Sequence, residues 1–75
     1  MSNIQSVVFD KDSWSRDEAR KWLNKHNLRP IKSAHTGTKT IRFRLKDPLK
    51  YTRFASKKLH DGITLVLGFN VKNRN

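Results

Sequence analysis

Apolar and cationic side chains alternate with a period of two along residues 38–46, T-K-T-I-R-F-R-L-K. This period is typical of a β-strand with one buried face, because successive side chains of a strand point to opposite sides. The apolar side chains are Ile41, Phe43 and Leu45, and the cationic ones are Arg42, Arg44 and Lys46. The pattern predicts a strand that closes a small core with one face and displays positive charge on the other.

Two interpretations of this cationic row are open. Side chains on the same face of a strand lie roughly 6.5–7 Å apart, which is close to the spacing of phosphates along a nucleic-acid strand. The row can therefore bind phosphates. It can equally be a solvated face whose charges only keep the protein soluble.

Residues 16–26 carry the pattern of one amphipathic helix. Ser15 and Glu18 have the S-x-x-E spacing of a capping box, which satisfies backbone N–H groups at the start of a helix. Asn27 can take the left-handed conformation that ends a helix, and Pro30 prevents continuation. The apolar stripe consists of Ala19, Trp22, Leu23 and His26. We expect the stripe to face the core and the basic opposite face to be solvated.

The segments before and after the central strand are less regular. Residues 4–9, I-Q-S-V-V-F, favour a first strand, and the polar residues 33–40 favour a loop. Asp47-Pro48 either stops the pairing of the central strand or opens a helical turn with Asp47 as its cap. In both cases we expect three residues to pack into the core, namely Leu49, Tyr51 and Phe54.

Asp61-Gly62 is the strongest hairpin signal in the chain and predicts a two-residue turn. Residues 53–59 would then pair with a strand over 63–69. A two-residue turn makes Leu59 a cross-strand neighbour of Thr64, and Lys57 a neighbour of Val66. Because Val66 adds apolar bulk to the second face of the last strand, we expect that strand to be covered on both sides.

The predicted order is strand, helix, strand, strand, strand. One amphipathic helix packed on a small antiparallel sheet of three to four strands buries every apolar face. The expected fold class is therefore α+β, with a β-α-β-β-β order. Residues 1–75 are expected to form a single small basic domain, ordered over about residues 4–70, with a frayed basic tail at 71–75.

The net charge of the chain is the strongest indication of its partner. Seventeen Lys and Arg residues against six Asp and Glu residues give +11. The excess lies in residues 20–75, which sum to +13, whereas residues 1–19 sum to −2. Self-repulsion on this scale destabilises a small fold unless a polyanion relieves it. Nucleic acid is the favoured partner, ahead of an anionic membrane or an acidic protein.

Several other functions lack the residues they need. The chain has no cysteine, and its three histidines, His26, His35 and His60, have no further ligand at a metal-binding spacing. No pair of carboxylates resembles an acid–base couple, and no glycine-rich loop could hold a phosphate. We expect neither an enzyme nor a cofactor. No signal peptide or membrane span is recognisable, which predicts an intracellular or intravirion protein with no membrane partner.

Four segments together carry a family resemblance: S-V-V-F-D-K-D-S-W-S, A-R-K-W-L-N-K-H, I-R-F-R-L-K-D-P and K-K-L-H-D-G-I-T-L-V-L-G-F. They resemble a small basic domain of nucleocytoplasmic large DNA viruses, with relatives in tailed-phage head or prohead-protease-linked proteins. The matching positions are Lys11, Trp14, Trp22, Leu23, His26, Arg42, Phe43, Arg44, Gly62 and Ile63. The resemblance implies a virion- or genome-associated setting and no particular activity.

These observations predict a viral nucleic-acid-binding protein, with DNA favoured over RNA, that contacts phosphates through a cationic sheet face. The candidate binding residues are Arg42, Arg44, Lys46, Arg53, Lys57, Lys58 and Lys39. The alternative is a structural or scaffold module of a virus particle that binds other virion proteins. Salt dependence separates the two, because phosphate binding weakens steeply with added salt.

Overall fold

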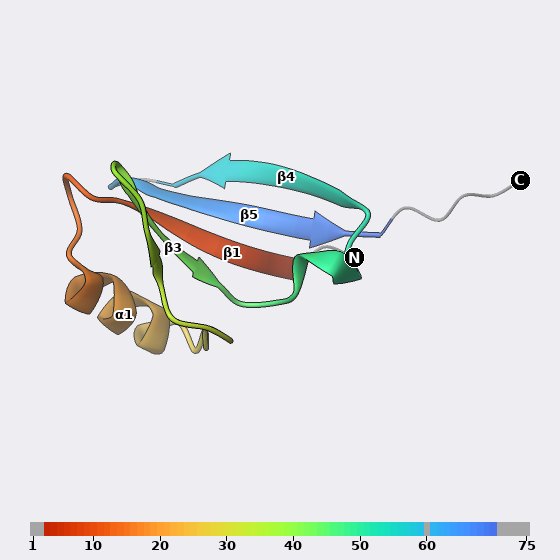
Figure 1. Ribbon diagram of the computed structural model, residues 1–75, viewed down its shortest axis with the longest axis horizontal. Coiled ribbons are helices and arrows are strands. Elements are labelled where there is room, and N and C mark those ends of the chain that lie inside the picture. The colour runs from red at the N-terminus through yellow and green to blue at the C-terminus, as the bar shows by residue number, and fades with distance from the viewer. Residues whose placement is uncertain (1–2, 60, 71–75) are drawn as a thin grey trace, which may run out of the picture.

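A computed structural model describes residues 3–59 and 61–70 of the chain. Its elements in chain order are β1 (Asn3–Asp10), α1 (Arg16–Lys25), β2 (His35–Thr36), β3 (Thr40–Arg44), the 3-10 helix η1 (Pro48–Lys50), β4 (Arg53–Lys58) and β5 (Ile63–Phe69). The strands form one antiparallel sheet in the order β2-β3-β1-β5-β4, with α1 beside its β1–β3 half (Figure 1). The tail expected at 71–75 lies outside the described residues.

The α+β class with one helix and an antiparallel sheet is confirmed, but the sheet has five strands rather than three to four. The additional strand is β2, which lies within the stretch expected to be a loop. His35 pairs with Arg42 and Thr36 pairs with Ile41 at the outer edge of β3. A ladder of two polar residues is too short to produce a periodic pattern, so the sequence could not reveal it.

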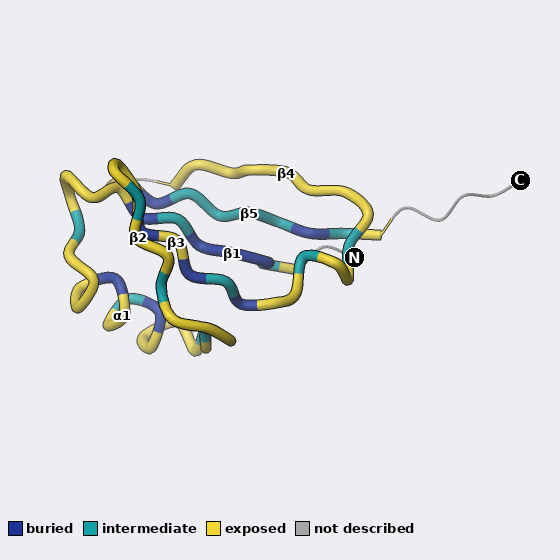
Figure 2. The backbone as a smooth tube through the Cα atoms, in the orientation of Figure 1, coloured by how far each residue is buried: buried dark blue, intermediate teal, exposed yellow. Residues whose placement is uncertain are grey.

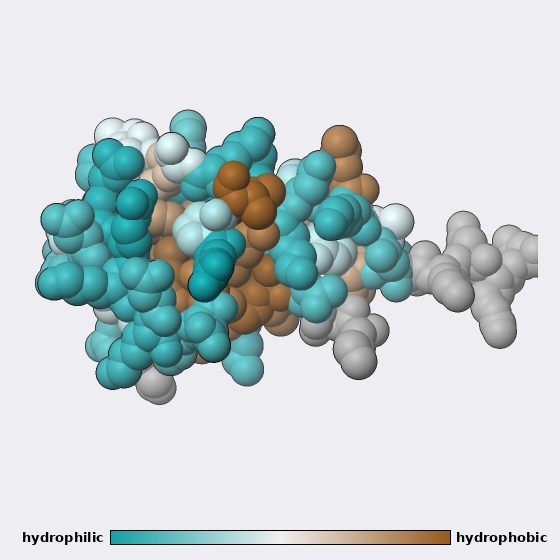
Figure 3. Space-filling model, turned by 90° about the horizontal axis from the view of Figure 1, so that it is seen from below, coloured by the Kyte–Doolittle hydropathy of each residue, from teal (hydrophilic) through white to brown (hydrophobic). Residues whose placement is uncertain are grey.

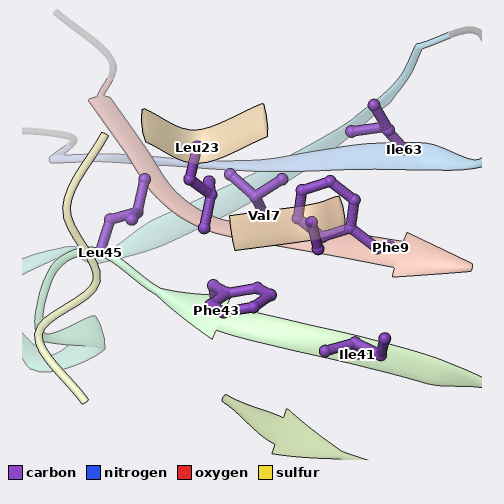
Figure 4. Close-up of a cluster of buried hydrophobic side chains, with 8 residues drawn as sticks. Val7, Phe9, Leu23, Ile41, Phe43, Leu45 and Ile63 are labelled. Carbon is purple, nitrogen blue, oxygen red and sulfur yellow. The ribbon is translucent and has the colours of Figure 1, made fainter. Parts of the chain in front are cut away.

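The core lies between α1 and one face of the sheet. Val7 pairs with Phe43, and Phe9 pairs with both Ile41 and Ile63, so these side chains share that face. The buried hydrophobic residues are Val7, Phe9, Ala19, Leu23, Ile41, Phe43, Leu45 and Ile63 (Figure 4). The predicted apolar parity of the central strand is therefore confirmed. Its alternate side chains point to the face that α1 does not cover.

Helix α1 begins as its sequence predicts. The Glu18 backbone N–H donates to Ser15 Oγ at 3.2 Å, and the Ser15 N–H donates to Glu18 Oε1 at 3.0 Å, which completes the capping box. Asn27 follows the helix with a φ of 61°, the left-handed conformation expected of it. Trp22 is half-buried and packs edge-on against Phe9 at 5.7 Å between ring centroids, so it belongs to the core as expected.

The hairpin between β4 and β5 forms, but not with the expected register. Lys58 pairs with Thr64 and Lys57 pairs with Leu65, one residue away from the pairing that a two-residue turn requires. The Leu59 N–H donates to the Ile63 carbonyl at 2.7 Å, so Leu59 lies opposite Ile63 and not opposite Thr64. A slip of one residue exchanges the two faces of a strand. The side chains of β4 consequently point opposite to the predicted directions.

The turn is fixed by a close approach to the end of β1. Gly62 has a φ of 74°, and its carbonyl accepts from the Asp10 N–H at 2.8 Å. A Cβ atom on Gly62 would lie 2.9 Å from the Asp10 Cβ, which is too close for a side chain. This long-range contact, which no local turn rule includes, accompanies the slipped register.

Two of the three packing residues expected after β3 were wrongly assigned. Leu49 is 90% exposed and Phe54 is 48% exposed, whereas Tyr51 is half-buried. The alternative left open at Asp47-Pro48 is settled in favour of a helical turn. The Leu49 N–H donates to Asp47 Oδ1 at 3.0 Å and caps η1.

Candidate nucleic-acid interface

The sheet has one face that α1 does not cover, which we call the open face. Strand registers place on it the side chains that alternate with the core. The positions are His35 of β2, Thr40, Arg42 and Arg44 of β3, Ser6, Val8 and Asp10 of β1, Thr64, Val66 and Gly68 of β5, and Phe54, Ser56 and Lys58 of β4. The colouring by burial shows that exposure rises toward β4, which is exposed along its whole length (Figure 2). The open face is therefore accessible to a large ligand.

Arg42 and Arg44 project from β3 in the interior of the open face. Arg42 stands between His35 on β2 and Val8 on β1, and Arg44 stands beside Ser6. None of these cross-strand neighbours is a carboxylate, so no direct partner in the ladder neutralises the two guanidinium groups. Both arginines lie on β3 with one residue between them, so a same-face spacing of about 6.5–7 Å is expected.

A first hollow lies on the β2 side of these arginines. It has a volume of about 410 Å³ and is lined by Lys32, Ser33, Ala34 and His35 together with Arg42 and Arg44. The Ile31 N–H donates to the Arg44 carbonyl at 2.9 Å, which ties the segment before β2 to the edge of β3. Lys32 and His35 thereby join the arginines around one hollow. Sequence reasoning missed both, because they lie in a stretch with no periodic pattern.

A second hollow lies on the other side of the same arginines. It has a volume of about 210 Å³ and is lined by Gln5, Ser6, Arg42, Arg44, Pro48, Phe54 and Val66. Phe54 contributes an aromatic ring that is 48% exposed. Tyr51 packs edge-on against Phe54 with 6.2 Å between ring centroids. An exposed aromatic ring and two guanidinium groups therefore share one depression of the open face.

Two of the predicted lysines lie at the opposite end of the open face. Lys39 and Lys58 line a hollow of about 460 Å³ together with Val8, Thr64 and the acidic residue Asp10. The Lys39 carbonyl accepts from the Lys11 N–H at 2.9 Å, which ties the loop before β3 to the end of β1. Lys39 and Lys58 thus extend the cationic surface that begins at Arg42.

The predicted cationic row ends at Arg44, so Lys46 does not continue it. The N–H groups of Leu45 and Lys46 both donate to the Gln5 carbonyl, at 2.8 and 3.2 Å. Two residues opposite one is the arrangement of a β-bulge, which breaks the alternation of side chains. Lys46 instead lines a hollow with Ile4 and Leu28 on the helix side of the sheet.

Arg53 and Lys57 also lie away from the open face. They pair with Phe69 and Leu65, and Leu65 pairs with the buried Val7, so both cations are on the helix side of β4. Of the seven predicted residues, the open face and its rim therefore bring together four, namely Arg42, Arg44, Lys58 and Lys39.

The helix side carries a different kind of surface. Beyond the end of α1, a hollow is lined by Ile4, Leu28 and Leu45, and Ile31 nearby in sequence is 54% exposed. Viewed from below Figure 1, the middle of the molecule shows apolar side chains with hydrophilic ones at both ends (Figure 3). Helix α1 is therefore too short to cover the whole apolar side of the sheet.

Within residues 3–59 and 61–70, no group of three or more His, Cys, Asp or Glu side chains could hold a metal ion. No helix in this part of the chain is long and apolar enough to cross a membrane. Comparison of the chain with models of protein families, with curated proteins and with solved structures finds no match.

Proposed function

We propose that this protein binds nucleic acid through the open face of its sheet, with DNA favoured over RNA. The observation that carries the proposal is the position of Arg42 and Arg44. They stand side by side on the face that α1 does not cover, and no carboxylate is their direct neighbour in the ladder. Each guanidinium group can form bidentate, charged hydrogen bonds with phosphate oxygens, as it can with a carboxylate.

The rest of the charge supports the same partner. Lys32 and His35 flank the arginines on one side, and Lys39 and Lys58 extend the surface toward the far end. One acidic residue also lies on this face: Asp10 of β1, which pairs with Thr40 on β3. A net charge of +11 on 75 residues attracts any polyanion. We propose that the polyanion binds at the open face.

The proposed role is binding without catalysis and without a cofactor. The setting that we propose for it is viral, either in an infected cell or inside the virion, on the strength of the resemblance described above. The partner in that setting would be the genome or another nucleic acid of the infection.

The test is the salt dependence of affinity in a double variant, Arg42→Ala with Arg44→Ala. Each lost phosphate contact should lower the slope of log affinity against log salt by about 0.9 on duplex DNA and about 0.7 on a single strand. The double variant should therefore lose affinity for every sequence, and its slope should fall by roughly 1.4–1.8. Arg42 is exposed and Arg44 is half-buried, so circular dichroism must confirm that the double variant keeps its fold.

The matched control removes two cations from the outer face of α1, Arg16→Ala with Lys21→Ala. Both are exposed, and the net charge falls by the same amount. This control should bind almost as tightly as the natural protein. Equal losses in the two double variants would mean diffuse attraction with no defined face, and a loss in the helix variant alone would refute the open face.

A second candidate function is a protein-interaction module of a virus particle. The observation that favours it is the uncovered apolar surface beyond α1, with Ile4, Leu28 and Ile31. Binding there would depend on apolar burial and change little with salt. Ile31→Asp would weaken such a contact and leave nucleic-acid binding at the open face intact.

A further inference from the structure

We infer that the ligand of the open face is single-stranded nucleic acid, with a base stacked on Phe54 and neighbouring phosphates bound by Arg42 and Arg44. This inference rests on the proposed function and adds the strandedness of the ligand and a residue that contacts its bases. The starting observation is that Phe54 and both arginines line the same hollow.

Phe54 is the exposed aromatic residue among the described large hydrophobic side chains at the surface. It is 48% exposed, and its cross-strand neighbour is Gly68, which has no side chain to cover it. The space above Gly68 is filled by the ring of Tyr51, since a Cβ atom on Gly68 would lie 2.6 Å from that ring. Tyr51 supports Phe54 from one side and leaves the remainder of the ring free to stack.

A row of side chains joins the arginines to the strand that carries Phe54. Arg44, Ser6, Val66 and Ser56 follow one another across β3, β1, β5 and β4. Of the two central members of this row, Ser6 is buried and Val66 is half-buried, so a ligand would contact mainly the arginines and the Phe54 ring that line the hollow. Three strand intervals span about 14 Å, so an extended nucleic-acid strand crossing the sheet contacts both the guanidinium groups and the ring.

A duplex fits this arrangement poorly. Five strands span about 19 Å, wider than the major groove of B-DNA at about 12 Å, so the whole open face cannot enter the groove. The faces of paired bases are also hidden by stacking within a duplex. A single strand exposes them, and combining an aromatic platform with a cationic groove is how single strands are bound without sequence preference.

The experiment measures fluorescence anisotropy of the full chain with three labelled probes: an octamer of deoxythymidine, an abasic strand of the same length, and a duplex of the same length. We expect the octamer to bind most tightly. Phe54→Leu keeps an apolar side chain but removes the ring, and it should weaken octamer binding by about five-fold or more. Phe54→Trp keeps an aromatic ring and should bind the octamer about as tightly as the natural protein does.

Leu49→Ala is the control, because Leu49 is an exposed apolar residue on η1 and does not line the hollow. It should bind the octamer normally. Circular dichroism of each variant checks that the fold persists, which is expected because Phe54 belongs to an edge strand and is half exposed.

The outcomes separate the inference from the proposed function. Equal affinities for octamer, abasic strand and duplex, with no effect of Phe54→Leu but a loss in the double arginine variant, would overturn base stacking while leaving nucleic-acid binding in place. Absence of salt-dependent binding to all three probes would overturn both. Octamer binding that depends on the Phe54 ring and on both arginines supports both.

Discussion

The aromatic ring of Tyr51 lies directly over Gly68, so close that a Cβ atom on the glycine would be 2.6 Å from two ring carbons. Gly68 does not have a positive φ, so its importance lies in packing and not in backbone conformation. The contact joins the segment after η1 to β5 and holds Tyr51 beside Phe54.

Gly68→Ala should therefore destabilise the protein by about 1–3 kcal/mol, the usual cost of overpacking. The added methyl group must displace the Tyr51 ring, because β5 lies between two paired strands and cannot move freely. Chemical denaturation monitored by circular dichroism measures the change. Since Tyr51 supports Phe54, the same variant should also bind single strands less tightly.

Gly37→Ala provides the control for this substitution. A Cβ atom on Gly37 would be 3.7 Å from its nearest neighbour, the Thr40 carbonyl oxygen, which is an ordinary contact distance. We expect a change in stability of about 0.5 kcal/mol or less. A Gly68→Ala protein as stable as Gly37→Ala would show that Tyr51 does not rest on Gly68.

Phe9 is the centre of the aromatic core. Its ring packs edge-on against Trp14, Trp22 and Phe43, with centroid distances of 5.1, 5.7 and 5.7 Å, and it has no exposed surface. Phe9→Ala should cost about 3–5 kcal/mol, which is enough to unfold a domain of this size. Phe9→Leu should stay folded with a lower melting temperature than the natural protein. Thermal melts of both variants test whether Phe9→Ala is the less stable of the two.

The stability of Trp22→Ala is compared with that of Phe9→Ala. Trp22 is only half-buried, so its removal should cost less than the removal of Phe9. If Trp22→Ala destabilised the protein more than Phe9→Ala, the centre of the core would lie on α1 and not on β1.

The elements that the sequence predicted well are those with a strong local signal. The alternation of Ile41 and Phe43 with two arginines specifies a strand and its buried face, and the Ser15–Glu18 capping box specifies where α1 begins. In both cases the residues that form the sequence pattern also form the local structural feature, so a short stretch of sequence is enough to predict it.

The parts that were wrong depend on contacts between distant residues. The slipped register of β4 occurs beside a contact between Gly62 and Asp10, which lie 52 positions apart in the sequence. Phe54 was expected in the core because it is apolar, yet the slipped register places it on the open face. Lys32 was missed for a different reason, because it lies in a stretch with no periodic pattern.

Because of the slipped register, two adjacent lysines of β4 point to opposite faces of the sheet, and their substitutions should have different effects on binding. Lys58 pairs with Thr64 on the open face and lines a hollow with Lys39, whereas Lys57 pairs with Leu65 on the helix side. Both are exposed, and both carry the same charge, so they differ only in the direction of the side chain. Lys58→Ala should weaken binding and lower the salt slope by about 0.7–0.9, depending on whether the probe is single- or double-stranded.

Lys57→Ala should leave the slope almost unchanged, although it lowers the net charge equally. Anisotropy titrations of both variants at several salt concentrations, with the same labelled octamer, measure the difference. Because the two residues are neighbours in one strand, a general effect of charge must affect them alike, and only a defined binding face can separate them. Equal slopes in the two variants would contradict binding at the open face. A loss confined to Lys57→Ala would place the ligand on the helix side instead.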